Sequence, residues 1–264
     1  MPDIQWNQQQ WGPGTDWSQS GDGWSNAWGG PDMQWHGSLF PRVHRYLPAG
    51  TILEIACGFG RWTHYLKDSC QKLIAVDLVE KCVEACKVRF ADSNHISYFV
   101  NDGKSLDFVA DGSVDFVFSF DSLVHVEPEV IKTYVSQLPR ILRKNGTAFI
   151  HHSNLGSYPA YQWSARIPKL RGLLSRTGFL ERSFHNREPR MSAALMEKFV
   201  AEAGMSVISQ ETVNWRTTSD MIDCFSVIAN TSEPQSGKRL LLENPAFMVE
   251  AAQLVKLAPL YGRK

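Results

Sequence analysis

The chain has 264 residues, 43% of them hydrophobic, and its 27 Lys and Arg residues equal its 27 Asp and Glu residues in number. This length suits one large domain with appendages, and the hydrophobic content is sufficient for a full core. A formal charge of zero argues against a protein coated in positive charge to hold a nucleic-acid backbone. No apolar run approaches the roughly 18 residues of a membrane-spanning helix, and the first residues lack the basic and apolar regions of a secretory signal.

Tryptophan and charge are concentrated at the beginning of the chain. Residues 1–35 contain four Asp, no Lys or Arg, and six of the nine Trp residues. Because large indole rings tend to be buried, we expect residues 1–36 to form an extended arm that packs on the domain or closes over a site as a lid. A disordered tail is the alternative.

The five cysteines are odd in number and include no C-x-x-C pair. Cys82 and Cys86 are four residues apart on an expected helix, but no second pair of metal-binding residues lies nearby. The pattern therefore favours buried free thiols in a reducing cytoplasm over a metal site.

Strands and helices alternate from residue 51 onward. We expect strands at residues 51–57, 72–77, 95–100, 114–120 and 147–152, with helices at 79–90 and 128–142. A helix at 192–203, with Gly204 as its C-cap, two strands at 205–214 and 223–230, and a helix at 240–260 broken near Pro245 complete the pattern. This alternation predicts an α/β, Rossmann-like, doubly wound and mostly parallel sheet with helices on both faces.

The expected organisation has five parts: the arm at 1–36, the core at 37–155, a basic insertion at 156–191, the completion of the core sheet at 192–232, and a C-terminal helical segment at 233–264. The last helix is apolar nearly all round. We therefore expect it to be buried against the domain or against another subunit of a homo-oligomer.

Ligands of doubly wound sheets bind beyond the carboxyl ends of the strands. The first strand is followed by a turn with Gly58 and Gly60, whose glycines permit a tight turn and close approach of a ligand. Thr63 stands where the G-x-G-x-x-G pattern of nicotinamide-dependent dehydrogenases has a third glycine, which disfavours that class.

Polar residues follow the next three strands. Asp77 lies 19 residues past Gly58, where a carboxylate can accept both hydroxyls of a ribose. Asp102 follows the third strand, where it could accept from an adenine amino group, and Asp121 follows the fourth. Each alone could be an N-cap or turn residue, but together they indicate one ligand site.

These motifs resemble those of class I S-adenosylmethionine (SAM)-dependent methyltransferases. The resemblance covers roughly residues 37–155 and rests on LEIACGFGRW, AVD, NDG and VDFVFSFDSLVHVE, with Ala56 in place of the family's common first glycine. It implies a seven-stranded sheet whose last strand is antiparallel, and SAM as the cofactor.

The resemblance also implies roles for individual residues. The loop around Glu54, Ala56 and Gly58 would hold the methionine moiety, and Asp77 would hold the ribose. The donor carboxylate could pair with Arg61, although a surface pair at a helix start is equally open to that residue. The full set of expected cofactor-binding residues is Glu54, Ala56, Gly58, Gly60, Arg61, Asp77, Leu78, Asp102, Gly103, Phe120 and Asp121.

Histidine is suited to take a proton from an acceptor hydroxyl near neutral pH. His151 and His152 end the fifth strand, and His125 follows the fourth strand on the same rim. Successive strand residues face opposite sides, so one of the adjacent pair should face the acceptor. We expect His152 to be the base, with His151 and then His125 as alternatives, and a purely structural role is open to each.

A divalent metal is a further alternative. Asp121, His151 or His152, and Asp220 or Asp223 could supply oxygen and nitrogen ligands. No compact ligand spacing supports this, so we expect SAM without a metal.

The basic insertion follows the expected catalytic rim. It holds seven Lys and Arg residues with several aromatic residues, and its expected acceptor-binding residues are Tyr158, Trp163, Arg166 and Arg187. An anionic acceptor held by Arg forks is one interpretation. A solvated helix face, or docking of the acidic arm, are the others.

The segments HHSNLG, WRTTSDMIDCFSV and ENPAFMVEAAQL are similar to bacterial methyltransferases that modify sugars and surface glycans. This looser resemblance favours O-methylation of a small-molecule or glycan hydroxyl in the cytoplasm, without nucleic-acid or membrane partners. A natural-product amine or phenol methyltransferase and a non-catalytic SAM-binding subunit are the alternatives.

Overall fold

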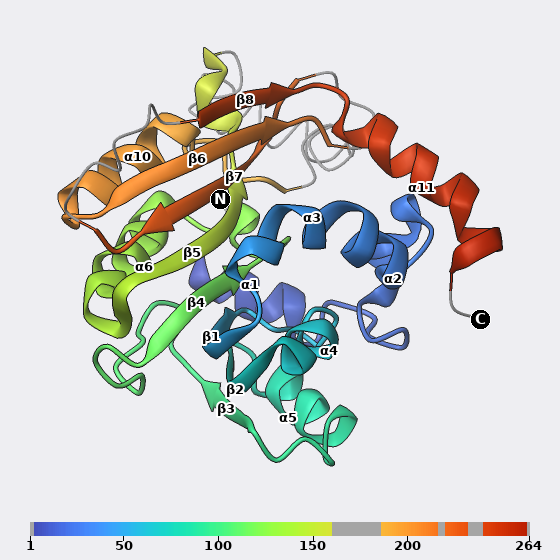
Figure 1. The fold of residues 1–264 in the computed structure, drawn as a ribbon, viewed down its shortest axis with the longest axis horizontal. Coiled ribbons are helices and arrows are strands. Elements are labelled where there is room, and N and C mark those ends of the chain that lie inside the picture. The colour runs from blue at the N-terminus through green and yellow to red at the C-terminus, as the bar shows by residue number, and fades with distance from the viewer. Residues whose placement is uncertain (1–2, 160–185, 216–219, 232–239, 263–264) are drawn as a thin grey trace.

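A computed structural model describes residues 3–159, 186–215, 220–231 and 240–262. Its centre is an eight-stranded sheet in the order β3-β2-β1-β4-β5-β7-β6-β8. The strands are β1 (Ala49–Ile55), β2 (Cys70–Asp77), β3 (Ile96–Val100), β4 (Val114–Ser119), β5 (Leu142–Ser153), β6 (Ser206–Val213), β7 (Asp223–Ala229) and β8 (Leu240–Asn244). Figure 1 shows the sheet running from β3 at one edge to β8 at the other.

Antiparallel pairing is confined to β7, which runs against both β5 and β6. The sequence correctly predicts the α/β sheet and the antiparallel strand that ends at residue 229, but seven strands is wrong. Residues 240–244 form β8, parallel to β6, where a helix was expected.

The long helices are α5 (Glu80–Arg89), α6 (Pro128–Ile141), α10 (Ala193–Glu202) and α11 (Phe247–Tyr261). As expected, α10 falls within residues 192–203 and is followed by Gly204, which has the left-handed conformation. Ser192 caps the start of the helix. Short helices complete the core: α4 (Thr63–Leu66), 3-10 turns at Lys67–Ser69, Leu123–His125 (η5) and Leu155–Ser157. The arm and its junction contain α1 (Ile4–Trp11), η1 (Asp22–Trp28), α2 (Pro31–Gln34), a π-helical turn at Trp35–Leu39, α3 (Phe40–Val43) and a 3-10 turn at His44–Tyr46.

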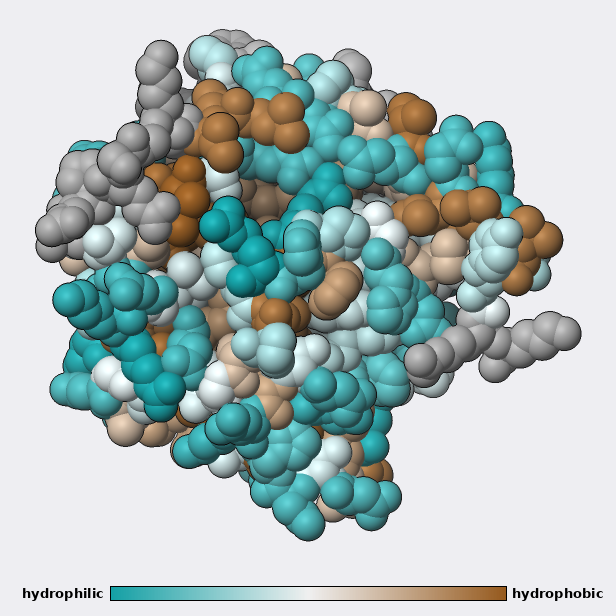
Figure 2. Space-filling view, viewed as in Figure 1, coloured by the Kyte–Doolittle hydropathy of each residue, from teal (hydrophilic) through white to brown (hydrophobic). Residues whose placement is uncertain are grey.

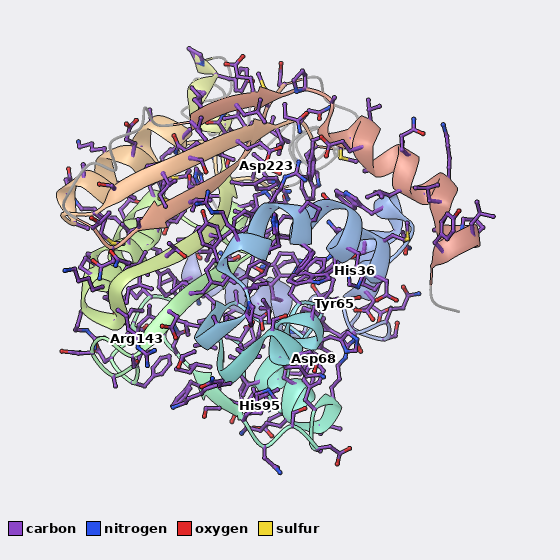
Figure 3. The ribbon with its side chains drawn as sticks, viewed as in Figure 1. His36, Tyr65, Asp68, His95, Arg143 and Asp223 are labelled. Atoms are coloured by element: carbon purple, nitrogen blue, oxygen red, sulfur yellow. The ribbon has the colours of Figure 1, made fainter. Side chains whose placement is uncertain are left out.

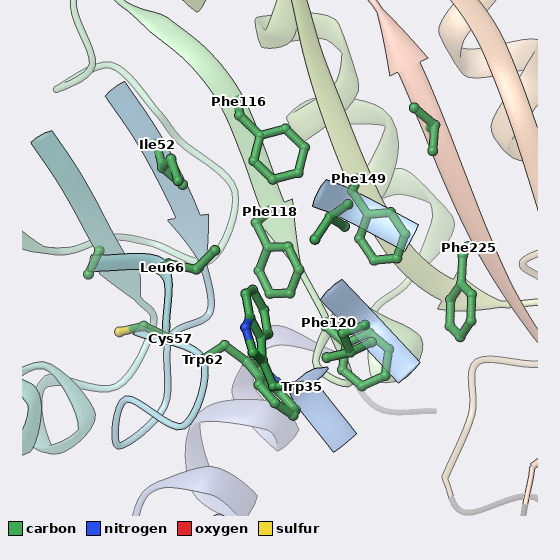
Figure 4. Close-up of a cluster of buried hydrophobic side chains, with 14 of the residues drawn as sticks. Trp35, Ile52, Cys57, Trp62, Leu66, Phe116, Phe118, Phe120, Phe149 and Phe225 are labelled. Atoms are coloured by element: carbon green, nitrogen blue, oxygen red, sulfur yellow. The ribbon is translucent and has the colours of Figure 1, made fainter. Parts of the chain in front are cut away.

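Alternation along the strands gives the sheet two different buried faces. One face carries aliphatic side chains such as Leu53 and Val117, and α6 and α10 cover it. The other carries a row of aromatic rings that includes Phe116, Phe118 and Phe149 (Figure 4). The arm, α4, α5 and the start of α11 cover this aromatic face.

The C-terminal helix packs against the arm. Phe247 and Ala251 are buried, and the backbone of Gly37 lies against Leu254. The outer side of α11 and most of β8 are exposed. The exposed hydrophobic side chains there are Leu240, Leu241, Leu242, Val249, Leu257 and Leu260. Figure 2 shows hydrophobic surface on this face of the molecule. None of the described helices is long and apolar enough to cross a bilayer.

Candidate active site

A cavity of about 1,090 Å³ opens beyond the carboxyl ends of β1, β2 and β4. Pockets for one drug-sized ligand are typically about 300–1,000 Å³, so this cavity has room for a nucleoside-sized donor and a small second molecule. Its floor comes from the strand ends, and its roof comes from the arm.

The turn after β1 places backbone against the cavity. Ala56 and Gly58 both have positive φ, 62° and 56°, which brings the chain back under the end of β2. The N–H groups of Ala56 and Cys57 both donate to the carbonyl of Val76, and Gly58 N donates to Asp77 Oδ2 at 2.8 Å. A left-handed alanine is costly, and such strain concentrates at functional sites.

Asp77 ends β2 with its carboxylate at the cavity wall. Besides the bond from Gly58, its Oδ1 accepts from Val79 N at 2.9 Å. Burial raises the pKa of Asp77 to about 6, because the charged form loses water. Each carboxylate oxygen keeps a further lone pair, which fits the expected role towards a pair of hydroxyls.

Two expected residues of the first turn do not line the cavity. Glu54 is buried behind it and accepts from Thr63 Oγ1 at 2.5 Å, and burial raises its pKa to about 8. Gly60, with φ of 84°, lies against the Phe90 ring, which a side chain at this position would strike. Both residues shape the turn rather than face the ligand space.

The three residues of the NDG motif, in the turn after β3, lie in different surroundings. Gly103 and Asn101 line the cavity. Asp102 is exposed, and its Oδ1 accepts from Lys104 N and Ser105 N at 3.0 and 2.6 Å. The interpretation of Asp102 as an adenine contact is therefore corrected, because its carboxylate caps its own turn.

Beyond the end of β4, two arginines and two aspartates pair with one another at the cavity wall. Asp121, at φ of 60°, accepts from Arg61 Nη2 at 3.0 Å, and its Oδ1 lies 3.6 Å from Arg187 Nη2. Arg187 donates through Nε and Nη2 to buried Asp223, with a shortest distance of 2.8 Å. Burial acts to raise the pKa of Asp121, but Arg61 and Arg187 outweigh it and hold that pKa below its ordinary value.

His151, near the end of β5, contacts both aspartates of this group. Its Nδ1 accepts from Asp121 N at 3.0 Å, so the neutral ring carries its proton on Nε2. Nε2 lies 3.3 Å from Asp223 Oδ2 without the alignment of a hydrogen bond. His151 is fully buried against the rings of Phe120, Trp215 and Phe225 and does not line the cavity.

The expectation that His152 is the base is also corrected. It faces the other side of β5, where Nδ1 lies 2.8 Å from Ser153 O and Nε2 lies 2.8 Å from Ser226 Oγ. Both nitrogens are occupied, and burial lowers its pKa to about 4. Because β7 pairs with β5 through this point, the end of β5 is covered instead of lying on the rim.

His125, the third choice from sequence, is the histidine of this group that lines the cavity. Its Nδ1 lies 3.0 Å from the carbonyl of Asn186, which can only accept, so Nδ1 carries the proton. No described residue pairs with Nε2, which is therefore available as an acceptor. Burial, together with the charge of Arg187, lowers the pKa of His125 to about 4.

The arm forms the roof. Asn7 Nδ2 donates to the carbonyl of His125 at 3.3 Å, and Asp22 pairs with Arg89 at 3.3 Å. The cavity is lined by six tryptophans, four of them from the arm: Trp11, Trp17, Trp24, Trp28, Trp62 and Trp215. Sequence reasoning missed Trp62 and Trp215 as site residues. Trp62 follows Arg61 in the turn after β1, and Trp215 lies just beyond the end of β6. Both are therefore near carboxyl ends of strands, where ligands are expected.

The expected acceptor residues separate into three groups. Arg187 lines the cavity. Tyr158 does not, because its hydroxyl accepts from Met221 N at 2.8 Å beside the end of β5. Trp163 and Arg166 lie outside the described residues.

Within the described ranges, no group of three or more His, Cys, Asp or Glu side chains converges as a metal site would require. In particular, the carboxylates of Asp121 and Asp223 are paired with arginines. All five cysteines are free, and Cys57 and Cys82 lie on the cavity wall.

Sheet order, the glycine turn and the Asp77 carboxylate agree with the donor site that the sequence resemblance implies. Residues 52–146, less than half of the chain, match the family model described as a methyltransferase domain.

Curated proteins with similar sequences include N-methyltransferases. Residues of this chain are 30% identical over 118 positions to phosphoethanolamine N-methyltransferase 1 of Triticum aestivum, covering 43% of this chain and 24% of that protein. They are 27% identical over 100 positions to nodulation protein S of Sinorhizobium fredii (strain NBRC 101917 / NGR234), covering 38% of this chain and 45% of that protein. The matched region thus spans less than half the length of either relative.

Solved structures share the fold. Magnesium protoporphyrin IX methyltransferase of Synechocystis PCC 6803, with bound SAH, aligns with a TM-score of 0.53 at 14% identity, covering 82% of this chain and 89% of that one. The N-methyltransferase NodS of Bradyrhizobium japonicum WM9 aligns with a TM-score of 0.52 at 14% identity, covering 76% and 97%.

Proposed function

We propose that this chain transfers a methyl group from SAM to a small acceptor under the arm, and that the acceptor atom is a hydroxyl oxygen of a sugar or glycan. The observation that carries the proposal is that donor-side residues and the unpaired Nε2 of His125 line one cavity. Stacked rings and mixed polar groups around the roofed half suit a sugar-sized ligand.

SAM supplies an electrophilic methyl group on a sulfonium centre. The work of the chain is to align an acceptor atom with that methyl and to exclude water, which the roof of arm residues favours. His125 is neutral at physiological pH because of its lowered pKa, so Nε2 can accept a hydroxyl proton. Its bond to Asn186 fixes the ring in the required tautomer.

Amine methylation is the second candidate. Two of the similar proteins described above are named as N-methyltransferases, and an aromatic wall can hold a cationic or neutral amine. The same cavity would serve, with His125 accepting the amine proton. A donor-binding protein without turnover is the third candidate.

Calorimetric titration with SAM, followed by transfer of a labelled methyl group to matched neutral sugars, amino sugars and alkylamines, separates these candidates. Acid- and base-stable product on a sugar lacking an amine supports O-methylation. Product on amines alone supports the second candidate, whereas SAM binding without any product supports the third.

A further inference from the structure

Arg187 combines deep burial with an unoccupied end. Its side chain is only 3% exposed, and it lines the cavity. The guanidinium lies over the Trp215 ring, 4.9 Å from its centroid, and donates to Asp223 through Nε and Nη2. The hydrogen bonds of Arg187 use Nε and Nη2, and Nη1 donates to no described residue, so its two N–H groups remain for a ligand.

The neighbouring carboxylates do not occupy this end of Arg187. Asp223 is engaged by Nε and Nη2 of Arg187, and Asp121 is engaged by Arg61 at 3.0 Å. Nη1 is therefore the part of the guanidinium that can bind an oxyanion, and charge-assisted bonds to guanidinium are about twice as strong as neutral ones.

The anchoring group and the base are tied together through the backbone. His125 Nδ1 bonds to the carbonyl of Asn186, and Arg187 is the next residue. His125 and Arg187 thus reach one cavity from adjoining pieces of backbone. A molecule held at Nη1 would extend into the cavity that His125 also lines.

We infer that the acceptor is a small hydroxylated oxyanion whose anionic oxygens bind Nη1 of Arg187 while a neighbouring hydroxyl faces His125. This inference rests on the proposed function and narrows its acceptor class. A sugar acid and a sugar phosphate share this chemistry, one through a carboxylate and the other through a phosphate.

The test is titration of three probes, glucuronate, glucose 6-phosphate and glucose, into protein saturated with S-adenosylhomocysteine. The variants are Arg187→Gln, Arg187→Lys and, as a matched control, Arg143→Gln. Arg143 lies near the start of β5 and forms an ion pair with Asp115. The other end of β5 pairs with β7 at Asp223 (Figure 3). Thermal melting of every variant checks the fold, and Arg187→Lys keeps a charge beside Asp223 if Arg187→Gln does not fold.

We expect at least one anionic probe to bind wild type about tenfold or more tightly than glucose. We expect that preference to fall about tenfold in the Arg187 variants and to survive in Arg143→Gln, with S-adenosylhomocysteine affinity unchanged throughout. The stronger of the two anionic probes distinguishes carboxylate from phosphate.

Equal binding of the three probes, binding of none, or an anion preference that survives both folded Arg187 variants overturns the inference while leaving the methyltransferase proposal intact. Failure of S-adenosylhomocysteine itself to bind counts against the proposed function instead.

Discussion

At the scale of single residues, Asp77 carries the clearest donor-binding prediction. Asp77→Asn should lower SAM affinity by about tenfold to a hundredfold, because a neutral amide replaces a carboxylate that accepts charge-assisted or paired hydrogen bonds. Calorimetric titration measures this affinity.

Asp102→Asn is the matched control for that experiment. Its carboxylate is exposed and bonds to its own turn, so SAM affinity should stay within about twofold of wild type. An equal loss in both variants would show that the effect is not specific to the cavity wall.

His125 carries the corresponding catalytic prediction. His125→Gln should lower kcat by about 10²–10⁴-fold if Nε2 takes the acceptor proton, and SAM affinity should be unchanged. Single-turnover kinetics with the acceptor found above measures the chemical step. The exposed His44 supplies the control, and a His44→Gln rate equal to that of His125→Gln would remove the base assignment.

The pH profile tests the same residue independently. Burial lowers the pKa of His125 to about 4, so the ring stays neutral as pH falls from 8 to about 5.5. With SAM and acceptor both saturating, so that titration of Asp77 in the free protein does not enter, we expect kcat to be flat across that window and to decline only near pH 4. A decline centred near the ordinary histidine value of about 6.5 would contradict a buried base.

Sequence reasoning located the group of candidate histidines and placed His152 first, whereas the structure leaves His125 as the one that lines the cavity. Strand alternation correctly separated His151 from His152, and the structure places them on opposite faces of β5. It could not tell that both faces are covered at that point, since the cover comes from Trp215, Asp223 and β7, which are distant in sequence.

At the scale of elements, the regular alternation predicted the strands from β1 to β7. The strands β1, β2, β4 and β7 contain buried apolar runs bounded by turns, whereas β3 and β6 are only partly buried. The alternation failed at β8, whose Leu240-Leu241-Leu242 run lacks β-branched residues and is exposed. Strand formation there depends on pairing with the edge of β6, a contact that propensity does not encode.

The tryptophans of the arm serve two different purposes, which yields a matched pair of variants. Trp17 stacks on Phe59 at 4.3 Å in a small separate cluster beside Gly58, whereas Trp28 belongs to the main aromatic core. Trp28→Ala should cost about 3–5 kcal/mol of unfolding free energy. Trp17→Ala should cost less and mainly weaken SAM binding.

Urea unfolding and SAM titration of the two proteins measure these effects. The separate roles of Trp17 in SAM binding and Trp28 in stability would be contradicted if Trp17→Ala unfolded as readily as Trp28→Ala, or if Trp17→Ala kept full SAM affinity. The structure also indicates that the arm has a boundary within it, because Trp28 and Trp35 are core residues while the residues around Trp17 form roof.

At the scale of the whole molecule, the cavity joins segments that the sequence keeps far apart. Its floor could be predicted, since the strand-end rule follows from topology alone. Its roof and its charged wall could not, because they depend on how residues 3–30, 186–187 and 215 fold back over that floor.

The buried acid Glu54 makes the stability of the whole molecule depend on pH. Its folded-state pKa is raised to about 8 by burial, against an unfolded value near 4.5. Between those values the folded chain holds a proton that the unfolded chain has lost, so stability must fall as pH rises through this range. His125 and His152 act in the opposite direction, because their unfolded forms still hold about half a proton each at pH 6.5 and lose it as pH rises.

Wild type without SAM should therefore lose about 1 kcal/mol of unfolding free energy between pH 6.5 and 8, measured by urea denaturation. Glu54→Gln keeps an oxygen for the Thr63 hydroxyl but cannot ionise, so its stability should not fall over that range. Equal slopes for the two proteins would mean that Glu54 is ionised in the folded state.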